Sequence, residues 1–319
     1  MSRRIHVWLL EPGAPAEPGQ RDALLRAIAG QPGRLPSWLA WLGPLGAWLW
    51  VWWWSRRLLP GPVAPTSAEE AQLRARALGR TLGEAWEAHA VLGATRSTSS
   101  SGGEALGVAE AAAHLSTGDR VALVEICPLG GPAATALAAE ARAAISGRGG
   151  TLLALPPGHE HEGWREAVAE TLRSAVADLA RNTPYEVLFY VSGLVGNGEG
   201  GAAARRLVAD LVCRAALARP HHLCFVPGPG VSGGDPGLSA AVARISRPST
   251  EALILVPLNT SDRAELPAVL DAVRATHPDL PLHVAPDPLP RASFVRALGD
   301  GLREAAGAED LQTRPARSA

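Results

Sequence analysis

The chain has 319 residues and a mass of 33.2 kDa, a length that corresponds to roughly two domains. Hydrophobic residues make up 47% and charged residues 19%, which excludes wholesale disorder and allows a sizeable buried core. With 30 basic and 31 acidic side chains the net charge is -1, so no global field attracts nucleic acid and no nucleic-acid partner is expected. The 3 cysteines form no CxxC pair, which is typical of a reducing cytoplasm.

Short apolar runs alternate with longer helical patterns along the chain. Strands are expected at 5–10, 90–93, 121–126, 151–155, 186–191, 222–226, 252–258 and 282–285. Helices are expected near 20–29, 69–90, 104–114, 133–145, 164–179, 201–217, 238–245, 263–276 and 291–306. Alternating strands and helices predict βαβ units and parallel sheets, and continuous runs such as Ala252–Val256 suit strands buried on both faces.

This pattern predicts an α/β fold made of two doubly wound, parallel-sheet halves with a cleft between them. The halves are expected to meet near Thr183, with residues 1–180 forming the N-terminal half and residues 181–319 the C-terminal half. Ligands of open α/β sheets bind beyond the carboxyl ends of the strands. The chemistry is therefore expected in the loops that follow the strands.

A tryptophan-rich segment interrupts the first half. It holds seven of the ten tryptophans and no charge between Arg34 and Arg56: Trp38, Trp41, Trp48, Trp50, Trp52, Trp53 and Trp54. We interpret residues 35–57 as a lip that contacts a membrane surface or an apolar ligand, because Trp prefers the headgroup interface and flanking Arg suits anionic lipid. An ordinary core helix pair and a true membrane span are the alternatives, and the prolines and glycines in the segment disfavour the span.

Several polar clusters carry weak chemical signals. His159 and His161 have the spacing of a metal pair on an extended segment, but a polar loop favours a solvated turn. His221 and His222 start a strand, where adjacent side chains point to opposite faces and do not share one ion. The glycine-rich segment 193–201 lacks the GxGxxG order of a nucleotide loop.

Asp262 and Glu265 follow a buried strand and open a predicted helix. At i, i+3 they share a helix face, which would point both carboxylates into the crevice beyond the strand ends. A capping box of Ser261 or Asp262 with Glu265 explains the same pattern. The two interpretations are compatible.

The order of motifs along nearly the whole chain resembles the ferrochelatase family, whose members insert ferrous iron into protoporphyrin. The resemblance is carried by Val7–Pro15, Leu35–Pro60, Thr66–Leu78, Val121–Pro128, His161–Trp164, Leu253–Glu265 and Arg291–Leu298. It implies two α/β halves around a cleft and an apolar lip of the kind that attaches many members to membranes. It also implies protoporphyrin or haem, together with ferrous iron, as ligands.

The resemblance assigns roles to single residues. Ser192 stands at the position of the family's catalytic His, while Glu265 matches a retained carboxylate that draws protons or, as a weak ligand, iron. The implied substrate-binding positions are Arg96, Ser97, Cys127, Gly193, Asp262 and Arg263. Of these, Arg96 matches the family's active-site Arg, which would orient a propionate, whereas Ser97, Cys127 and Arg263 replace aromatic or imidazole side chains.

A hydroxyl cannot replace imidazole as a neutral-pH base or an iron ligand. We therefore expect a tetrapyrrole-binding protein of haem metabolism with impaired catalysis; an active divergent ferrochelatase is the alternative. No tightly bound cofactor is expected, and three scattered cysteines predict no iron–sulfur cluster. The expected location is the cytoplasm, with peripheral attachment to the inner face of the membrane as an option, and a protein partner remains open.

Overall fold

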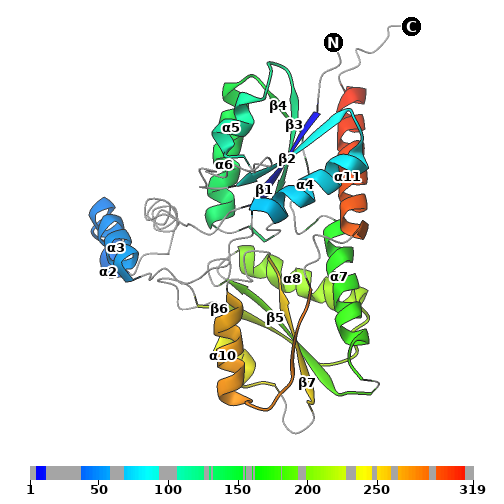
Figure 1. Cartoon of the computed structure of the whole chain (residues 1–319). Coiled ribbons are helices and arrows are strands. Elements are labelled where there is room, and N and C mark those ends of the chain that lie inside the picture. The colour runs from blue at the N-terminus through cyan, green and yellow to red at the C-terminus, as the bar shows by residue number, and fades with distance from the viewer. Residues whose placement is uncertain are drawn as a thin grey trace.

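The computed structural model places most of the chain in defined secondary structure. It describes residues 5–11, 37–57, 68–92, 106–125, 129–130, 132–153, 155, 160, 162–180, 182–192, 199–227, 235–245, 250–259, 265–286 and 292–312. Two stacked halves make up the molecule; on one side, helix α11 runs along the half that contains β1 and helix α7 along the half that contains β5 (Figure 1).

The N-terminal half contains four parallel strands in the order β2-β1-β3-β4. They are β1 (Ile5–Glu11), β2 (Trp86–Leu92), β3 (Arg120–Glu125) and β4 (Thr151–Leu153). Strand β1 lies between two neighbours, and its residues 7–10 are buried on both faces of the sheet. This position explains the continuous apolar run, since a strand covered on both sides needs no polar face.

The C-terminal half repeats the same plan with the order β6-β5-β7-β8. Its strands are β5 (Tyr185–Ser192), β6 (His221–Val226), β7 (Ala252–Pro257) and β8 (Leu282–Val284). All four are parallel, and β5 occupies the place that β1 has in the first half. The predicted α/β fold of two parallel-sheet halves is confirmed.

Ten helices are described around these sheets. They are α2 (Ser37–Ala40), α3 (Pro44–Arg57), α4 (Ala68–Leu82), α5 (Val108–Ala113), α6 (Pro132–Gly147), α7 (Glu162–Ala177), α8 (Glu199–Arg214), α9 (Leu238–Val242), α10 (Leu266–Thr276) and α11 (Ala292–Gln312). The helix expected near residues 20–29 lies outside the described residues.

Two helices tie the halves together. Helix α7 leaves the first half and packs on α8 and β7, whereas α11 follows the second half and packs on α4, β4 and α7. The α7–α11 contact is close at Gly163, where a Cβ atom would lie 2.2 Å from the Cβ of Ala297. The Nη2 of Arg120 also donates a hydrogen bond to the carbonyl oxygen of Ala306 in α11 at 3.0 Å. The chain therefore crosses between the halves twice, and a boundary at 180/181 stays a prediction.

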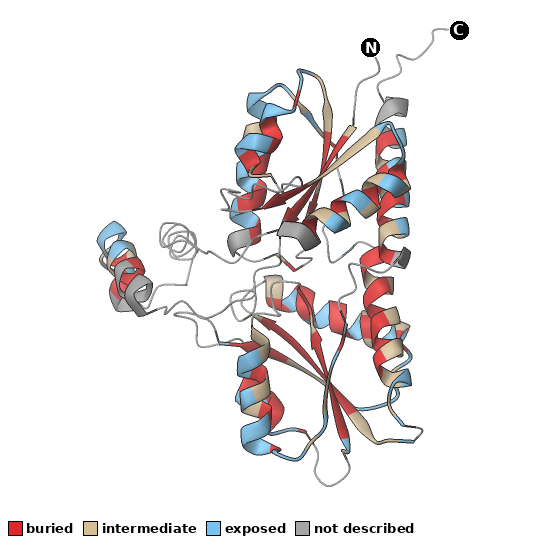
Figure 2. Ribbon diagram, in the orientation of Figure 1, coloured by how far each residue is buried: buried red, intermediate tan, exposed pale blue. Residues whose placement is uncertain are grey.

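The buried core follows this arrangement (Figure 2). One hydrophobic cluster contains residues of both sheets together with α4, α7, α8 and α11, so it is continuous from one half to the other. Two further clusters cover the opposite faces, one beneath α5 and α6 and the other beneath α9 and α10. Both faces of each sheet are thus covered by helices, as expected for parallel sheets.

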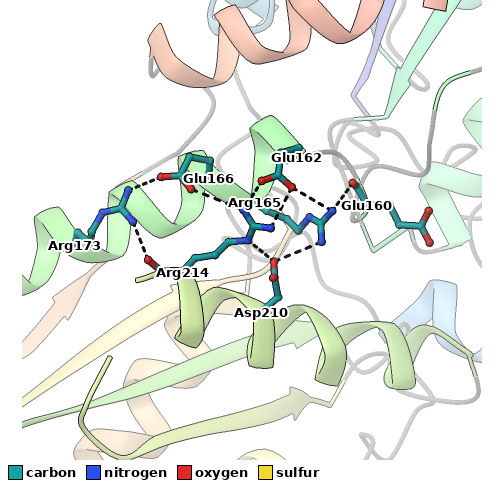
Figure 3. A network of polar contacts seen from close by, with 7 residues as sticks. All are labelled: Glu160, Glu162, Arg165, Glu166, Arg173, Asp210 and Arg214. Atoms are coloured by element: carbon teal, nitrogen blue, oxygen red, sulfur yellow. Dashed lines mark hydrogen bonds and ion pairs between the residues drawn. The ribbon is translucent and has the colours of Figure 1, made fainter. Parts of the chain in front are cut away.

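Charged side chains join α7 to α8 on the surface (Figure 3). The Nε of Arg214 donates to Asp210 at 2.7 Å, and its guanidinium also pairs with Glu162 of α7. One η nitrogen of Arg173 donates to Glu166 at 2.6 Å, while the other donates to the carbonyl oxygen of Arg214 at 3.0 Å. This network holds the crossing helix α7 against the second half, although partly exposed ion pairs contribute little stability one at a time.

The first long helix is shorter than predicted. The pattern at 69–90 predicts one helix, but α4 ends at Leu82 and residues 86–92 form β2. Gly83 has φ +92°, a left-handed conformation that ends a helix and that glycine adopts without strain. Glu87 and His89 are compatible with a helical or a strand pattern, so they do not mark the boundary. The strand predicted to begin at residue 90 therefore begins at Trp86 instead.

The tryptophan-rich segment forms a helical hairpin of α2 and α3. The hairpin projects from the side opposite α7 and α11 (Figure 1). Helix α3 has 14 residues, and none of the helices that the structure describes is long and apolar enough to cross a membrane.

Candidate functional site

The carboxyl edges of the two sheets are joined by a buried hydrogen bond. The backbone N–H of Leu129, which follows β3, donates to Oδ1 of Asn259, which follows β7, at 3.0 Å. The two residues are 130 positions apart in the chain and both are buried. Since all strands of a parallel sheet end at one edge, this bond makes the two carboxyl edges face each other, where α/β folds place their ligands.

Ser192 is the last residue of β5, the inner strand of the second sheet between β6 and β7. It is half-buried and lies opposite Val226 in the register of β5 and β6. The backbone N–H of Leu258 donates to the carbonyl oxygen of Tyr190 at 3.0 Å, so the chain leaving β7 runs beside the end of β5. Ser192 therefore lies at the same edge as Asn259, as the strand pattern predicts.

Glu265 stands at the N-cap of α10, six positions after Asn259. Helix α10 leads back to β8, which is parallel to β7, so the start of α10 lies on the carboxyl side of the sheet. Glu265 lies in a 3-10 turn directly before α10, which begins at Leu266, and the predicted capping partners Ser261 and Asp262 lie outside the described residues, so the capping box stays a prediction. The side chain makes no capping hydrogen bond.

Burial makes the Glu265 carboxyl group a weaker acid than an exposed glutamate. Burial raises its pKa above the ordinary glutamate value, because desolvation penalises the charged form. A carboxyl group shifted in this direction holds and releases a proton closer to neutral pH than an exposed glutamate does. This is the property required of a group that accepts protons from a weak N–H acid.

Six residues predicted for the site lie outside the described residues: Arg96, Ser97, Cys127, Gly193, Asp262 and Arg263. His159 and His161 also lie outside them. Asn259 belongs to a segment that the sequence singles out, but its role was missed. The available signal is a polar residue directly after a fully buried strand, because such a residue must find a hydrogen-bond partner.

The hairpin divides its tryptophans between surface and interior. Trp41 and Trp48 are 84% and 58% exposed, and Leu45 beside them is also exposed. Trp50 is only 2% exposed, and Leu39 and Val51 of the same hairpin are also buried. The side chains of Trp38, Trp52, Trp53 and Trp54 lie outside the described residues. An apolar contact surface on the described hairpin therefore rests on Trp41 and Trp48, and Trp50 does not contribute to it.

No protein-family model matches the sequence, and no curated protein matches it. Solved structures do match its fold. One is CbiX, described as the terminal enzyme for biosynthesis of sirohaem in denitrifying bacteria; the TM-score is 0.52 at 15% identity, over 95% of this chain and 99% of that one.

Another match is DR2241 from Deinococcus radiodurans, described as a multi-domain protein with structural similarity to chelatases and two additional novel domains. The TM-score is 0.50 at 14% identity, over 95% of this chain and 55% of that one. At such identities the likeness concerns the fold. The chain therefore has a chelatase-like α/β fold.

Proposed function

We propose that this chain binds a tetrapyrrole between the carboxyl edges of its two sheets and is a chelatase relative with impaired metal insertion. The observation that carries the proposal is Ser192. It ends the inner strand of the second sheet, at the position where the resembled family has its catalytic His. The chelatase-like fold and the carboxyl-edge location of Ser192 and Glu265 support the same reading.

Metal insertion needs a proton acceptor. As ferrous iron enters the ring, two pyrrole N–H protons leave, and a base near neutral pKa must receive them. A serine hydroxyl does not serve as that base, so Ser192 leaves the reaction without its usual acceptor. Under this proposal Glu265 is the remaining catalytic group, and it draws protons away or holds iron weakly as it arrives.

The substrate would be held by the residues around it. Arg96 is proposed to pair with a propionate carboxylate, a geometry in which guanidinium binds two oxygens. Ser97, Cys127 and Gly193 have small side chains, which would leave a wider site than in the resembled family. Asp262 and Arg263 are proposed to complete the polar side of the site.

The tetrapyrrole itself has two candidates. The resemblance to ferrochelatases favours protoporphyrin or haem in haem metabolism. The fold match to an enzyme of sirohaem biosynthesis favours a metal-free precursor of sirohaem, which carries more carboxylates. Titration of the chain with each compound in parallel decides between them, because the compound that the site is built for should have the lower Kd.

An active divergent chelatase is the second candidate function. The raised pKa of Glu265 favours it, since a carboxyl group that titrates closer to neutral pH accepts protons in the absence of an imidazole. The two candidates share the ligand and differ in turnover.

We propose that the exposed rings of Trp41 and Trp48 contact a membrane surface or guide the apolar ligand. Both rings project from a hairpin that stands away from the sheets, and Trp favours the headgroup interface. A cytoplasmic protein attached peripherally to the inner face of the membrane fits this surface. A protein partner that covers the same rings is the other occupant to test.

Ferrous insertion by the wild type, Ser192→His and Ser192→Ala tests the proposal. We expect slow insertion by the wild type and a gain of about 10² or more for Ser192→His, because a positioned general base contributes about 10²–10⁴ in rate. Ser192→Ala is the matched control and should equal the wild type. The proposal of impairment fails if the wild type turns over at ordinary enzyme rates, about 1–10³ per second. It also fails if Ser192→His binds porphyrin and gains nothing.

A further inference from the structure

A cluster of histidines and carboxylates lies at the amino edge of the first sheet, remote from the carboxyl edge where Ser192 and Glu265 lie. His6 is the second residue of β1, while Glu87 and His89 are the second and fourth residues of β2. The register of β1 and β2 places His6 directly beside Glu87. Because residues two apart on a strand share a face, all three side chains lie on one face of the sheet.

The three side chains converge closely. One ligand atom from each lies within 4.8 Å of the other two. The Nε2 of His89 is 3.5 Å from Oε1 of Glu87, and the Nδ1 of His6 is 3.8 Å from Oε2 of Glu87. Ligand atoms at zinc distances of about 2.0–2.2 Å in a tetrahedron lie about 3.3–3.6 Å apart. The two histidine-to-glutamate separations are therefore within a few tenths of an ångström of those in a zinc site.

These imidazoles are buried without hydrogen bonds. His6 is 2% exposed, and neither of its ring nitrogens, nor the Nε2 of His89, forms a hydrogen bond among the described residues. Burying such groups unbonded is costly, and native structures rarely leave them so. Of these atoms, Nδ1 of His6 and Nε2 of His89 are the ones that lie beside Glu87.

The surroundings of the cluster resemble the outer shell of a metal centre. The carboxylate of Asp119 lies 3.3 Å from Nε2 of His6, on the side of the ring away from Glu87. A carboxylate behind a ligating histidine fixes the ring and its tautomer. The ring of His89 stacks between those of His6 and His114, with centroids 5.9 and 6.0 Å away. The side chain of Glu87 is 41% exposed and leaves a route for an ion from solvent.

The second half shows how such a cluster looks when it needs no ion. At the amino edge of its sheet, Nε2 of His222 lies 2.6 Å from Oε2 of buried Glu186, and the hydroxyl of Thr250 donates to the other oxygen. The acid and base there satisfy each other directly. In the first half the equivalent edge carries His6, His89 and exposed His114, and among the described residues neither ring nitrogen of His6 nor Nε2 of His89 is hydrogen-bonded.

We propose that His6, Glu87 and His89 form a binding site for one divalent cation of the zinc class, separate from the tetrapyrrole region. Two imidazoles and one carboxylate are the ligand types that Zn²⁺ prefers, whereas Mg²⁺ and Ca²⁺ prefer oxygen ligands alone. The ion ties the start of β1 to the start of β2, and the fourth position faces solvent. The site does not depend on the proposed function.

The test is zinc binding by the untagged, metal-stripped full chain. We expect one Zn²⁺ per wild-type chain after dialysis, and visible absorption of tetrahedral type when Co²⁺ replaces it. His89→Gln and Glu87→Gln should lose the ion, and Asp119→Asn should bind it about 10–100-fold more weakly, the usual effect of removing a carboxylate behind a ligand. His221→Gln is the matched control: His221 is an exposed histidine at the start of β6, and the variant should keep full stoichiometry.

Two further measurements keep the proposal falsifiable if a ligand variant unfolds. Zn²⁺ at a hundredfold excess over Kd should raise the wild-type Tm by about 5 °C, and Mg²⁺ should not. Glu265→Gln, on the carboxyl side of the second sheet, should leave the stoichiometry unchanged. The proposal is overturned if the wild type binds no zinc or gains no thermal stability from it. It is equally overturned if folded His89→Gln retains the ion or if Glu265→Gln removes it.

Discussion

The hydrogen bond between the two carboxyl edges offers a direct test of how the site is held. Asn259→Ala removes the acceptor and leaves the buried N–H of Leu129 unsatisfied. Leaving a buried donor unsatisfied costs about 1–3 kcal/mol. At about 2 °C per kcal/mol for a chain of this size, the Tm should fall by about 2–6 °C. Because the bond spans the halves, porphyrin affinity should fall as well.

Thr171→Val is the matched control for that substitution. Thr171 is also buried, and its hydroxyl donates to the carbonyl oxygen of Ala167 at 2.8 Å within α7, inside one helix. Its removal should cost about 1 kcal/mol or less, because that carbonyl keeps its helical partner, and it should leave porphyrin affinity unchanged. Calorimetry and a porphyrin titration on the two variants give both readouts. The reasoning is refuted if Asn259→Ala equals the wild type in Tm and in porphyrin affinity.

Two more predictions concern the hairpin and Glu265. Replacing exposed Trp41 and Trp48 together by Ser should weaken binding to anionic liposomes with the Tm unchanged. Trp50→Ser, at a buried ring, should destabilise the hairpin by about 3–5 kcal/mol. If the double substitution and Trp50→Ser had equal effects on liposome binding and on stability, the division into exposed and buried tryptophans would be contradicted. Because burial raises the pKa of Glu265, folding favours the protonated carboxyl group. This contribution to stability is complete below pH 4.5 and is lost as the pH rises through the raised pKa. Glu265→Gln should therefore have a higher Tm than the wild type at pH 7 and the same Tm below pH 4.5; a lower Tm at pH 7 would contradict the shift.

Local pattern was sufficient to predict the sheets. Runs such as Ala252–Val256 are continuous because β7 is covered on both faces and therefore needs an apolar residue at every position. The pattern of strands alternating with helices also predicts that Ser192 and Glu265 lie at the carboxyl edge, because each comes at or after the end of a parallel strand. The end of α4 was missed because residues 83–89 are compatible with a helix, and only Gly83 marks the stop.

Contacts between distant segments were not predictable from local pattern. The bond from Leu129 to Asn259 joins residues 130 positions apart, and no periodicity indicates it. The cluster of His6, Glu87 and His89 was hidden for a second reason. Residues 86–90 were interpreted as helix, where Glu87 and His89 point in different directions, whereas on β2 they share a face.

The central claim is that the carboxyl edges of the two sheets hold a tetrapyrrole. An absorbance and fluorescence titration of the full chain with protoporphyrin, and in parallel with a metal-free sirohaem precursor, tests it most directly. The account predicts a saturable, one-to-one spectral shift at micromolar protein for one of the two compounds, and a weaker shift for Arg96→Gln. Unchanged spectra for both compounds at micromolar protein would contradict the claim.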